Sequence, residues 1–325
     1  MDIKELILEL ENIRNLPQFV FFDTVSPISA IQARQSVIEF KKDKGEIGEV
    51  DLIIHSPGGS PDEAYRIIRT FRKNFKKINC IIPFWAKSAA TLMALGGSEI
   101  IMDEYGEFGP LDAQIGKRGE DGPHFVRESA LNDEHSLRVI EERFQEMFES
   151  MFVRIYGHQD INIPRSELSK QLLDNLSKFY DPLVSQINPY KLGEKRRILD
   201  IGGNYAKTIL TQAQQDIDVI TQFVHYLVHE CPDHGFVVDY DIVRAFDLAN
   251  IKSSSDVSNK YADVLQELSM ALMLKDVTYV GFVEDEELPN LESEEESTIT
   301  DAKKENQNGT DRKSKTGTPK KANSE

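Results

Sequence analysis

Apolar and polar residues follow one another in blocks along the first hundred residues, in the repeated order strand, helix, strand. Short apolar runs are typical of buried strands, and segments with one charged and one apolar face are typical of helices that cover a sheet. Strands are expected at 18–23, 51–55, 78–84 and 99–102, and helices at 1–15, 28–44 and 89–95. This order predicts an α/β fold with a parallel sheet and covering helices.

Ser88 lies where the strand at 78–84 passes into the small-residue helix at 89–95. A helix N-terminus offers free backbone N–H groups, which favour a negative charge that develops beside them. This is a suitable place for a nucleophile. Serine at such a junction is, however, also the ordinary helix-capping residue. Taken alone, the stretch favours a cap.

A glycine-containing turn at 56–59 makes the nucleophile interpretation of Ser88 stronger. The strand at 51–55 runs into Ser-Pro-Gly-Gly at 56–59, and glycines can direct backbone amides at a ligand because they carry no Cβ. Such a pair of amides can form an oxyanion hole. In a parallel sheet the ligand crevice lies at the carboxyl ends of the strands. Gly58, Gly59 and Ser88 all fall there.

Four motifs follow one another in order over roughly residues 50–250. They are His55-Ser56-Pro57-Gly58-Gly59, Ala86-Lys87-Ser88-Ala89-Ala90-Thr91, Phe108-Gly109-Pro110-Leu111-Asp112-Ala113-Gln114-Ile115 and Asp233-His234-Gly235-Phe236. Their order and spacing resemble the Clp-fold serine proteases, and most closely the serine dehydrogenase proteinase family. The resemblance implies a Clp/crotonase-like α/β domain over residues 1–283. It also implies a serine endopeptidase that hydrolyses peptide bonds through an acyl-enzyme.

The same resemblance implies a catalytic triad of Ser88, Asp112 and His234. Ser88 would be the nucleophile and His234 the general base, and Asp112 would orient the imidazole. In the Clp proteolytic subunit the acid and the histidine take the opposite positions, and triads occur in several chain orders. The donors to the oxyanion would be the backbone amides of Gly58, Gly59 and Ala89.

The residue types leave alternatives open for these roles. Asp112 after Gly-Pro is as readily a turn residue, and Asp103 is a rival acid. Some relatives with this fold use a Ser–Lys dyad, for which Lys87 and Lys117 are the candidates, since a buried lysine can act as a base. Lys87 would instead point away from the crevice or onto a carboxylate. His55 would line the crevice or pack in the interior.

Composition and charge narrow the range of partners. The formal net charge of −17 on 325 residues argues against a nucleic-acid surface, which needs clustered Lys and Arg. The two cysteines make neither a disulfide framework nor a metal site, and they fit a cytoplasmic location. His225 and His229 have metal-ligand spacing, but a solvated helix face is the favoured interpretation. No apolar run reaches the roughly 18–20 residues that span a bilayer, and the N-terminus does not resemble a signal peptide.

The chain changes character after residue 129. Helical patterns at 130–156, 165–180 and 204–230 predict a helical lid or oligomerisation region over about 130–230. The Gly-rich segment 116–126 is expected to form a loop or hairpin, and 188–203 a basic linker between helices. Residues 284–325 are poor in apolar residues, first acidic and then basic, which predicts a disordered tail.

The expected partners are a peptide or unfolded protein substrate and further copies of the chain in a homo-oligomer. No cofactor, metal, nucleic acid or membrane is expected, and whether an ATPase feeds the site stays open. Two other functions fit the same motifs. A crotonase-type acyl-CoA enzyme shares the fold and the two-amide oxyanion hole, and an inactive scaffold would keep the fold alone. Labelling of Ser88 by a fluorophosphonate separates the peptidase from both.

Overall fold

The computed structural model describes residues 2–111, 114–118, 125–129, 131–158, 161–213 and 216–283. For residues 114–118, 125–129 and 131 it describes the backbone. Asp112 and the segment 284–325, which the sequence analysis interprets as a triad acid and a tail, lie outside the described residues.

A six-stranded sheet forms the centre of the fold, in the order β10-β5-β3-β2-β1-β11. Every neighbouring pair is parallel except β1 and β11, which are antiparallel. The strands are β1 (Gln18–Phe22), β2 (Glu49–His55), β3 (Lys77–Ile82), β5 (Glu99–Met102), β10 (Ile251–Ser253) and β11 (Tyr279–Phe282). The predicted α/β fold with a mostly parallel sheet and covering helices is therefore confirmed.

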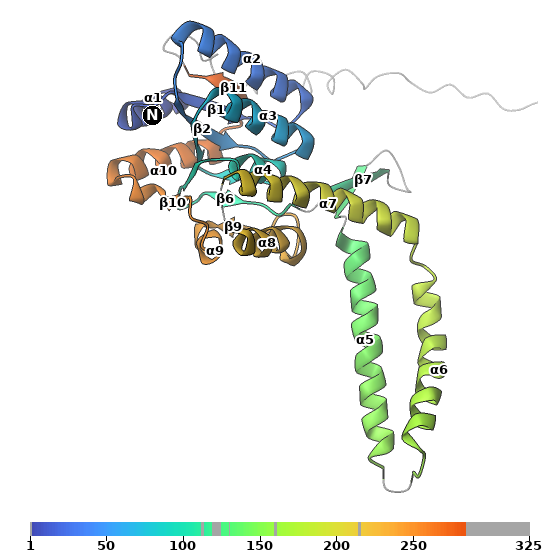
Figure 1. Cartoon of the computed structure of the whole chain (residues 1–325). Coiled ribbons are helices and arrows are strands. Elements are labelled where there is room, and N and C mark those ends of the chain that lie inside the picture. The colour runs from blue at the N-terminus through green and yellow to red at the C-terminus, as the bar shows by residue number, and fades with distance from the viewer. Residues whose placement is uncertain are drawn as a thin grey trace, which may run out of the picture. The chain divides into compact units, whose positions relative to one another are not determined.

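Helices cover both faces of this sheet, as a parallel sheet requires (Figure 1). Side chains alternate along each strand, so Phe19 and Phe21 of β1 join the core beneath α2, α3 and α4, whereas Val20 and Phe22 face the other way. On the second face α1 packs against α10. The helices are α1 (Ile3–Arg14), α2 (Pro27–Lys44), α3 (Pro61–Asn74), α4 (Ala89–Ala94) and α10 (Asn259–Leu274).

The middle of the chain is helical, as the sequence predicts. A two-stranded hairpin of β7 (Gln114–Arg118) and β8 (Phe125–Ser129) precedes it. The long helices α5 and α6 run side by side (Figure 1), and α7 follows them. These elements are α5 (Leu131–Tyr156), α6 (Arg165–Val184), α7 (Pro189–Gln212), α8 (Ile217–His225) and the π-helical turn Tyr226–Glu230. Among the described residues, none of the helices is both long and apolar enough to cross a membrane.

The predicted linker at 188–203 is wrong, because these residues form most of α7. Asn188 caps the helix, and the basic residues find acidic partners on α5, with Lys195 Nζ 2.8 Å from a carboxylate oxygen of Asp133. A Cβ on Gly202 would lie 3.3 Å from the Leu111 carbonyl oxygen. The glycine therefore lets the helix pack closely against the backbone. Tertiary contacts outweigh the weak helix propensity of glycine here.

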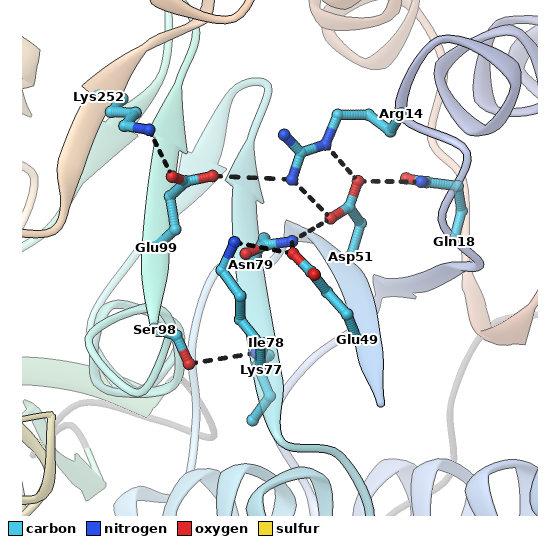
Figure 2. A network of polar contacts seen from close by, with 10 residues as sticks. All are labelled: Arg14, Gln18, Glu49, Asp51, Lys77, Ile78, Asn79, Ser98, Glu99 and Lys252. Atoms are coloured by element: carbon cyan, nitrogen blue, oxygen red, sulfur yellow. Dashed lines mark hydrogen bonds and ion pairs between the residues drawn. The ribbon is translucent and has the colours of Figure 1, made fainter. Parts of the chain in front are cut away.

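A buried polar network ties α1 to the amino ends of the strands (Figure 2). The Arg14 guanidinium donates two hydrogen bonds to the carboxylate of Asp51, at 3.0 and 3.1 Å. Asp51 has no exposed surface, and it also accepts from Gln18 and Asn79. Because donors from α1, β1 and β3 converge on the Asp51 carboxylate of β2, the network fixes the helix and three strands against one another.

We expect Arg14→Met to lower the free energy of unfolding by about 3–5 kcal/mol, because it leaves the Asp51 carboxylate buried without its cation. Urea-induced unfolding measures the change. Lys252→Met is the control, since Lys252 is half exposed and pairs with Glu99 at the edge of the same network. It should cost no more than about 1 kcal/mol. Equal losses in the two variants would contradict this account.

Candidate active site

Ser88 occupies a sharp turn between the short strand β4 (Trp85–Ala86) and α4. Its φ of 49° and ψ of −117° lie outside the conformations that side chains other than glycine's favour. Its hydroxyl makes no capping hydrogen bond to the first turn of α4. Ser88 therefore holds the N-cap position of α4 without capping the helix through its side chain. A strained strand-to-helix turn that presents a partly exposed serine is the arrangement of a nucleophile in several hydrolases.

The Gly-Gly turn after β2 packs directly against this serine. A Cβ on Gly58 would lie 2.5 Å from the Lys87 carbonyl oxygen and 2.9 Å from Ser88 Cβ, so only glycine fits. Gly58 and Gly59 have φ of 95° and 146°, which glycine adopts without steric cost. Gly58 is buried and its N–H donates to Ser56 Oγ at 3.1 Å, whereas Gly59 is exposed.

Ala89 supplies the third expected amide. It is the first residue of α4, and helix geometry leaves the amides of the first turn without an acceptor inside the helix. The strands beneath are joined at the same point, because Ser56 N–H donates to the Trp85 carbonyl and Lys87 N–H to the Ser56 carbonyl, at 2.8 and 3.0 Å. The glycine turn and the serine turn are thus held edge to edge.

A three-stranded sheet of β4, β6 (Glu107–Phe108) and β9 (Val238–Asp239) brings the remaining motifs together. Ala86 is opposite Phe108, and Phe108 is opposite Val238. β4 and β6 run parallel, and β9 runs against them. The residues after β4 and β6 and those before β9 therefore leave from the same end of the sheet. Ser88 and His234 are both within four residues of that end.

Asp112 lies outside the described residues, but Leu111, the residue before it, is bonded to the chain that leads to His234. Leu111 N–H donates to the Leu227 carbonyl at 2.8 Å, in the π-helical turn that ends four residues before His234. A π-helical turn widens the backbone and frees carbonyl groups, and such turns are frequent at functional sites. The chain that leads into Asp112 is thus attached to the chain that leads into His234.

His234 sits in a tight turn between the π-helical turn and β9. Asp233 organises the turn, because its carboxylate accepts from Gly235 N–H at 2.7 Å and its carbonyl from Phe236 N–H at 3.2 Å. His234 lies inside this turn and is partly exposed. The turn therefore leaves the histidine outside the hydrophobic core.

His55 is the packing residue that the sequence allowed. Its ring stacks on Phe84, with centroids 5.8 Å apart, and contacts Phe22 edge-on. Nδ1 accepts from the Trp85 N–H at 3.4 Å. Burial lowers the pKa of this imidazole to about 4, which the charge of Asp276 partly opposes. His55 is therefore neutral at physiological pH and is a partly buried packing residue.

The structure also places His225 and the two lysines that the sequence offers as alternative bases. His225 lies on the solvated face expected of it, with Nδ1 3.0 Å from Glu230 Oε1, and no cluster of three metal-ligating side chains was found in the described part of the chain. Lys87 points onto a carboxylate, as anticipated, with Nζ 2.8 Å from Glu107 Oε1. Lys117 is on β7, where only the backbone is described.

Asp103, the rival acid, lies apart from the serine turn in an acidic cavity of about 420 Å³ that sequence reasoning missed. The cavity lies beyond the carboxyl ends of β5 and β10, and its lining includes neither Ser88 nor His234. Asp103 is 2% exposed and accepts from the Tyr105 N–H at 3.2 Å. Burial raises the pKa of its carboxyl to about 6. No sequence signal marked the cavity, because its walls come from segments far apart in the chain.

Comparisons with known proteins match parts of this chain. Two uncharacterized proteins of Methanocaldococcus jannaschii, MJ0137 and MJ1495, are 41% and 43% identical to this chain over 68 residues. That stretch is 21% of this chain and 24% and 23% of theirs, so the chain matches about a quarter of the length of these relatives.

A solved structure described as a peptidase from Plasmodium falciparum aligns with 31% of this chain and 64% of its own, at 12% identity. Its TM-score of 0.27 is too low to carry an argument. The family model of the ClpP-like SDH-type serine proteinases matches residues 29–124, which include Gly58, Gly59, Ser88 and Asp112 but not His234. Residues 29–124 of this chain therefore match the model of the ClpP-like SDH-type serine proteinases, the family that the four motifs resemble.

Proposed function

We propose that this protein is a serine peptidase that works through an acyl-enzyme. The observation that carries the proposal is the conformation of Ser88, which is strained, partly exposed and free of a capping role, directly against a Gly-Gly turn. A serine that only ended a strand would have no need of this conformation. The match of residues 29–124 to a family described as serine proteinases supports the same chemistry.

In the proposed mechanism Ser88 Oγ attacks the carbonyl carbon of the scissile peptide bond, and His234 takes the hydroxyl proton. The carbonyl oxygen becomes an oxyanion, and His234 then gives the proton to the leaving amine. Water, activated by the same base, releases the acyl group. Of the three expected amides, those of Gly59 and Ala89 suit the oxyanion best, because Gly58 N–H already donates to Ser56 Oγ. One such donor is worth about 10²–10³ in kcat.

Asp112 would orient the His234 imidazole and stabilise its cation. The register of β4, β6 and β9 supports this assignment, since it directs the chain toward all three residues from one end of the sheet. The hydrogen bond from Leu111 to the π-helical turn supports it independently. Lys87 is a poor alternative base, because its ammonium is paired with Glu107.

Ser88→Ala and His234→Ala should each lower hydrolysis of fluorescein-labelled casein by more than about a thousandfold, and combining them should add little, because the two residues act as one unit. A fluorophosphonate probe should label the wild type at Ser88, as mapped by mass spectrometry. His55→Phe is the matched control, since it replaces a neighbouring neutral histidine with a ring that keeps the stacking. It should remain labelled. A wild type that takes up no label would refute the peptidase and leave the acyl-CoA enzyme or the scaffold.

Asp112→Asn should reduce casein hydrolysis less than His234→Ala, because it disturbs the tautomer and orientation of the base but leaves nucleophile and base in place. Lys117→Ala should retain most of the activity. The measurement is kcat/KM for the three variants under one set of conditions. Activity that survives in His234→Ala and disappears in Lys117→Ala would make a lysine the base instead.

We also propose that the chain forms a homo-oligomer. Large apolar side chains stand exposed on α5 and α6, among them Val153 at 68% and Phe179 at 64% exposed, and exposed apolar surface of this kind marks interaction sites. Light scattering after size exclusion should give a multiple of the monomer mass. A single monomeric species at micromolar concentration would contradict the proposal.

A further inference from the structure

The strained backbone of Ser88 needs support from its neighbours. A conformation with φ of 49° persists only where the surrounding structure holds it. The backbone of Lys87 is fixed on both sides, since its N–H donates to the Ser56 carbonyl at 3.0 Å and its carbonyl accepts from Ala90 N–H at 2.9 Å. The residue before the serine is therefore the anchored part of the turn.

The side chain of Lys87 extends this anchor to the next strand. Its Nζ lies 2.8 Å from Glu107 Oε1 and donates to the Phe108 carbonyl at 3.4 Å. Both charged side chains are only 14% exposed, so solvent screens the pair weakly. The aliphatic stem lies on Gly109, where a Cβ would come within 2.8 Å of Lys87 Cδ. The backbone, the aliphatic stem and the ammonium group of Lys87 therefore each have a contact that fixes them.

Glu107 is itself on the central strand of the small sheet, opposite Trp85 on one side and Asp239 on the other. A second link joins the same strand to α4, because Gly109 N–H donates to Thr91 Oγ1 at 3.1 Å, and that hydroxyl donates to the Ala86 carbonyl at 2.6 Å. Ser88 lies between the two links. The strand at 107–109, which leads toward Asp112, therefore holds the serine turn before and after the serine.

We propose that Lys87 and Glu107 are positioning residues for the nucleophile. Their ion pair fixes the strained turn of Ser88 against the strand that continues toward Asp112, and so sets the distance between the nucleophile and the rest of the triad. This inference rests on the proposed peptidase function. Lys87 takes no proton in it, because its role requires the ammonium to stay paired with the carboxylate.

The test is the rate at which a fluorophosphonate labels Ser88 in Lys87→Met and in Glu107→Gln, at a temperature well below the unfolding midpoint of each variant. Methionine keeps the stem on Gly109 and removes the charge. We expect each variant to be labelled about 10- to 100-fold more slowly, since a displacement of about 1 Å can cost that much. For casein, kcat should fall by a similar factor with KM changed less than about twofold, because substrate binding does not involve the pair.

Lys252→Met, which breaks the ion pair with Glu99 at the opposite edge of the sheet, is the control and should be labelled at the wild-type rate. The double variant Lys87→Met with Glu107→Gln leaves no unpaired charge, so it tests the proposal if a single variant does not fold, and it should be as slow as the single variants. If Ser88 is labelled at the wild-type rate in the Lys87 and Glu107 variants, whatever their unfolding midpoints, the positioning role is refuted while the peptidase function stands.

If Lys87→Met loses activity while Glu107→Gln keeps full activity, the positioning role is refuted too, since Lys87 would then be a base. A wild type without label would refute the proposed function itself.

Discussion

The backbone of Ser88 adopts a conformation that costs of order 1–3 kcal/mol for a residue with a side chain, and the candidate site depends on that cost being met by its surroundings. Two glycines make room for the groups that hold this conformation. Gly58 lets a backbone pass within van der Waals contact of Ser88, and Gly109 leaves room for the Lys87 stem. The helix that follows is built of small residues because it is buried among α3, β2 and β3.

The amino and carboxyl ends of the strands in the main sheet carry different kinds of residues. At the amino ends of β2, β3 and β5, one guanidinium and two amide side chains converge on the buried carboxylate of Asp51 and tie α1 to the strands (Figure 2). At the carboxyl ends the glycine turn and the serine turn meet. Because the polar network and the glycine turn lie at opposite ends of β2, substitutions that alter stability and those that alter chemistry should be separable in this fold.

The family match ends at residue 124, and His234, the proposed base, lies beyond it. The helices α5, α6 and α7 separate Asp112 from His234 by more than a hundred residues of sequence, and β9 then returns to pair with β6. Arg72 helps to close the insertion onto the body, since it donates to the carbonyl groups of Gly96 and Ile209 at 3.2 and 3.0 Å. The bond to Ile209 ties α7 of the insertion to α3 of the body.

The sequence by itself determined the parallel sheet and its covering helices, because apolar periodicity and the order of elements along the chain can be read locally. It also determined that Ser88, Gly58 and Gly59 would share one edge of the sheet. It could not decide whether Ser88 caps a helix or presents a nucleophile, because both roles place the same residue at the same junction and only the backbone angles differ. It misjudged residues 188–203, where packing of Gly202 on the Leu111 backbone overrides helix propensity. The direction of Lys87, the ring packing of His55 and the acidic cavity at Asp103 were likewise decided by tertiary structure, because each depends on contacts between segments that lie far apart in the chain.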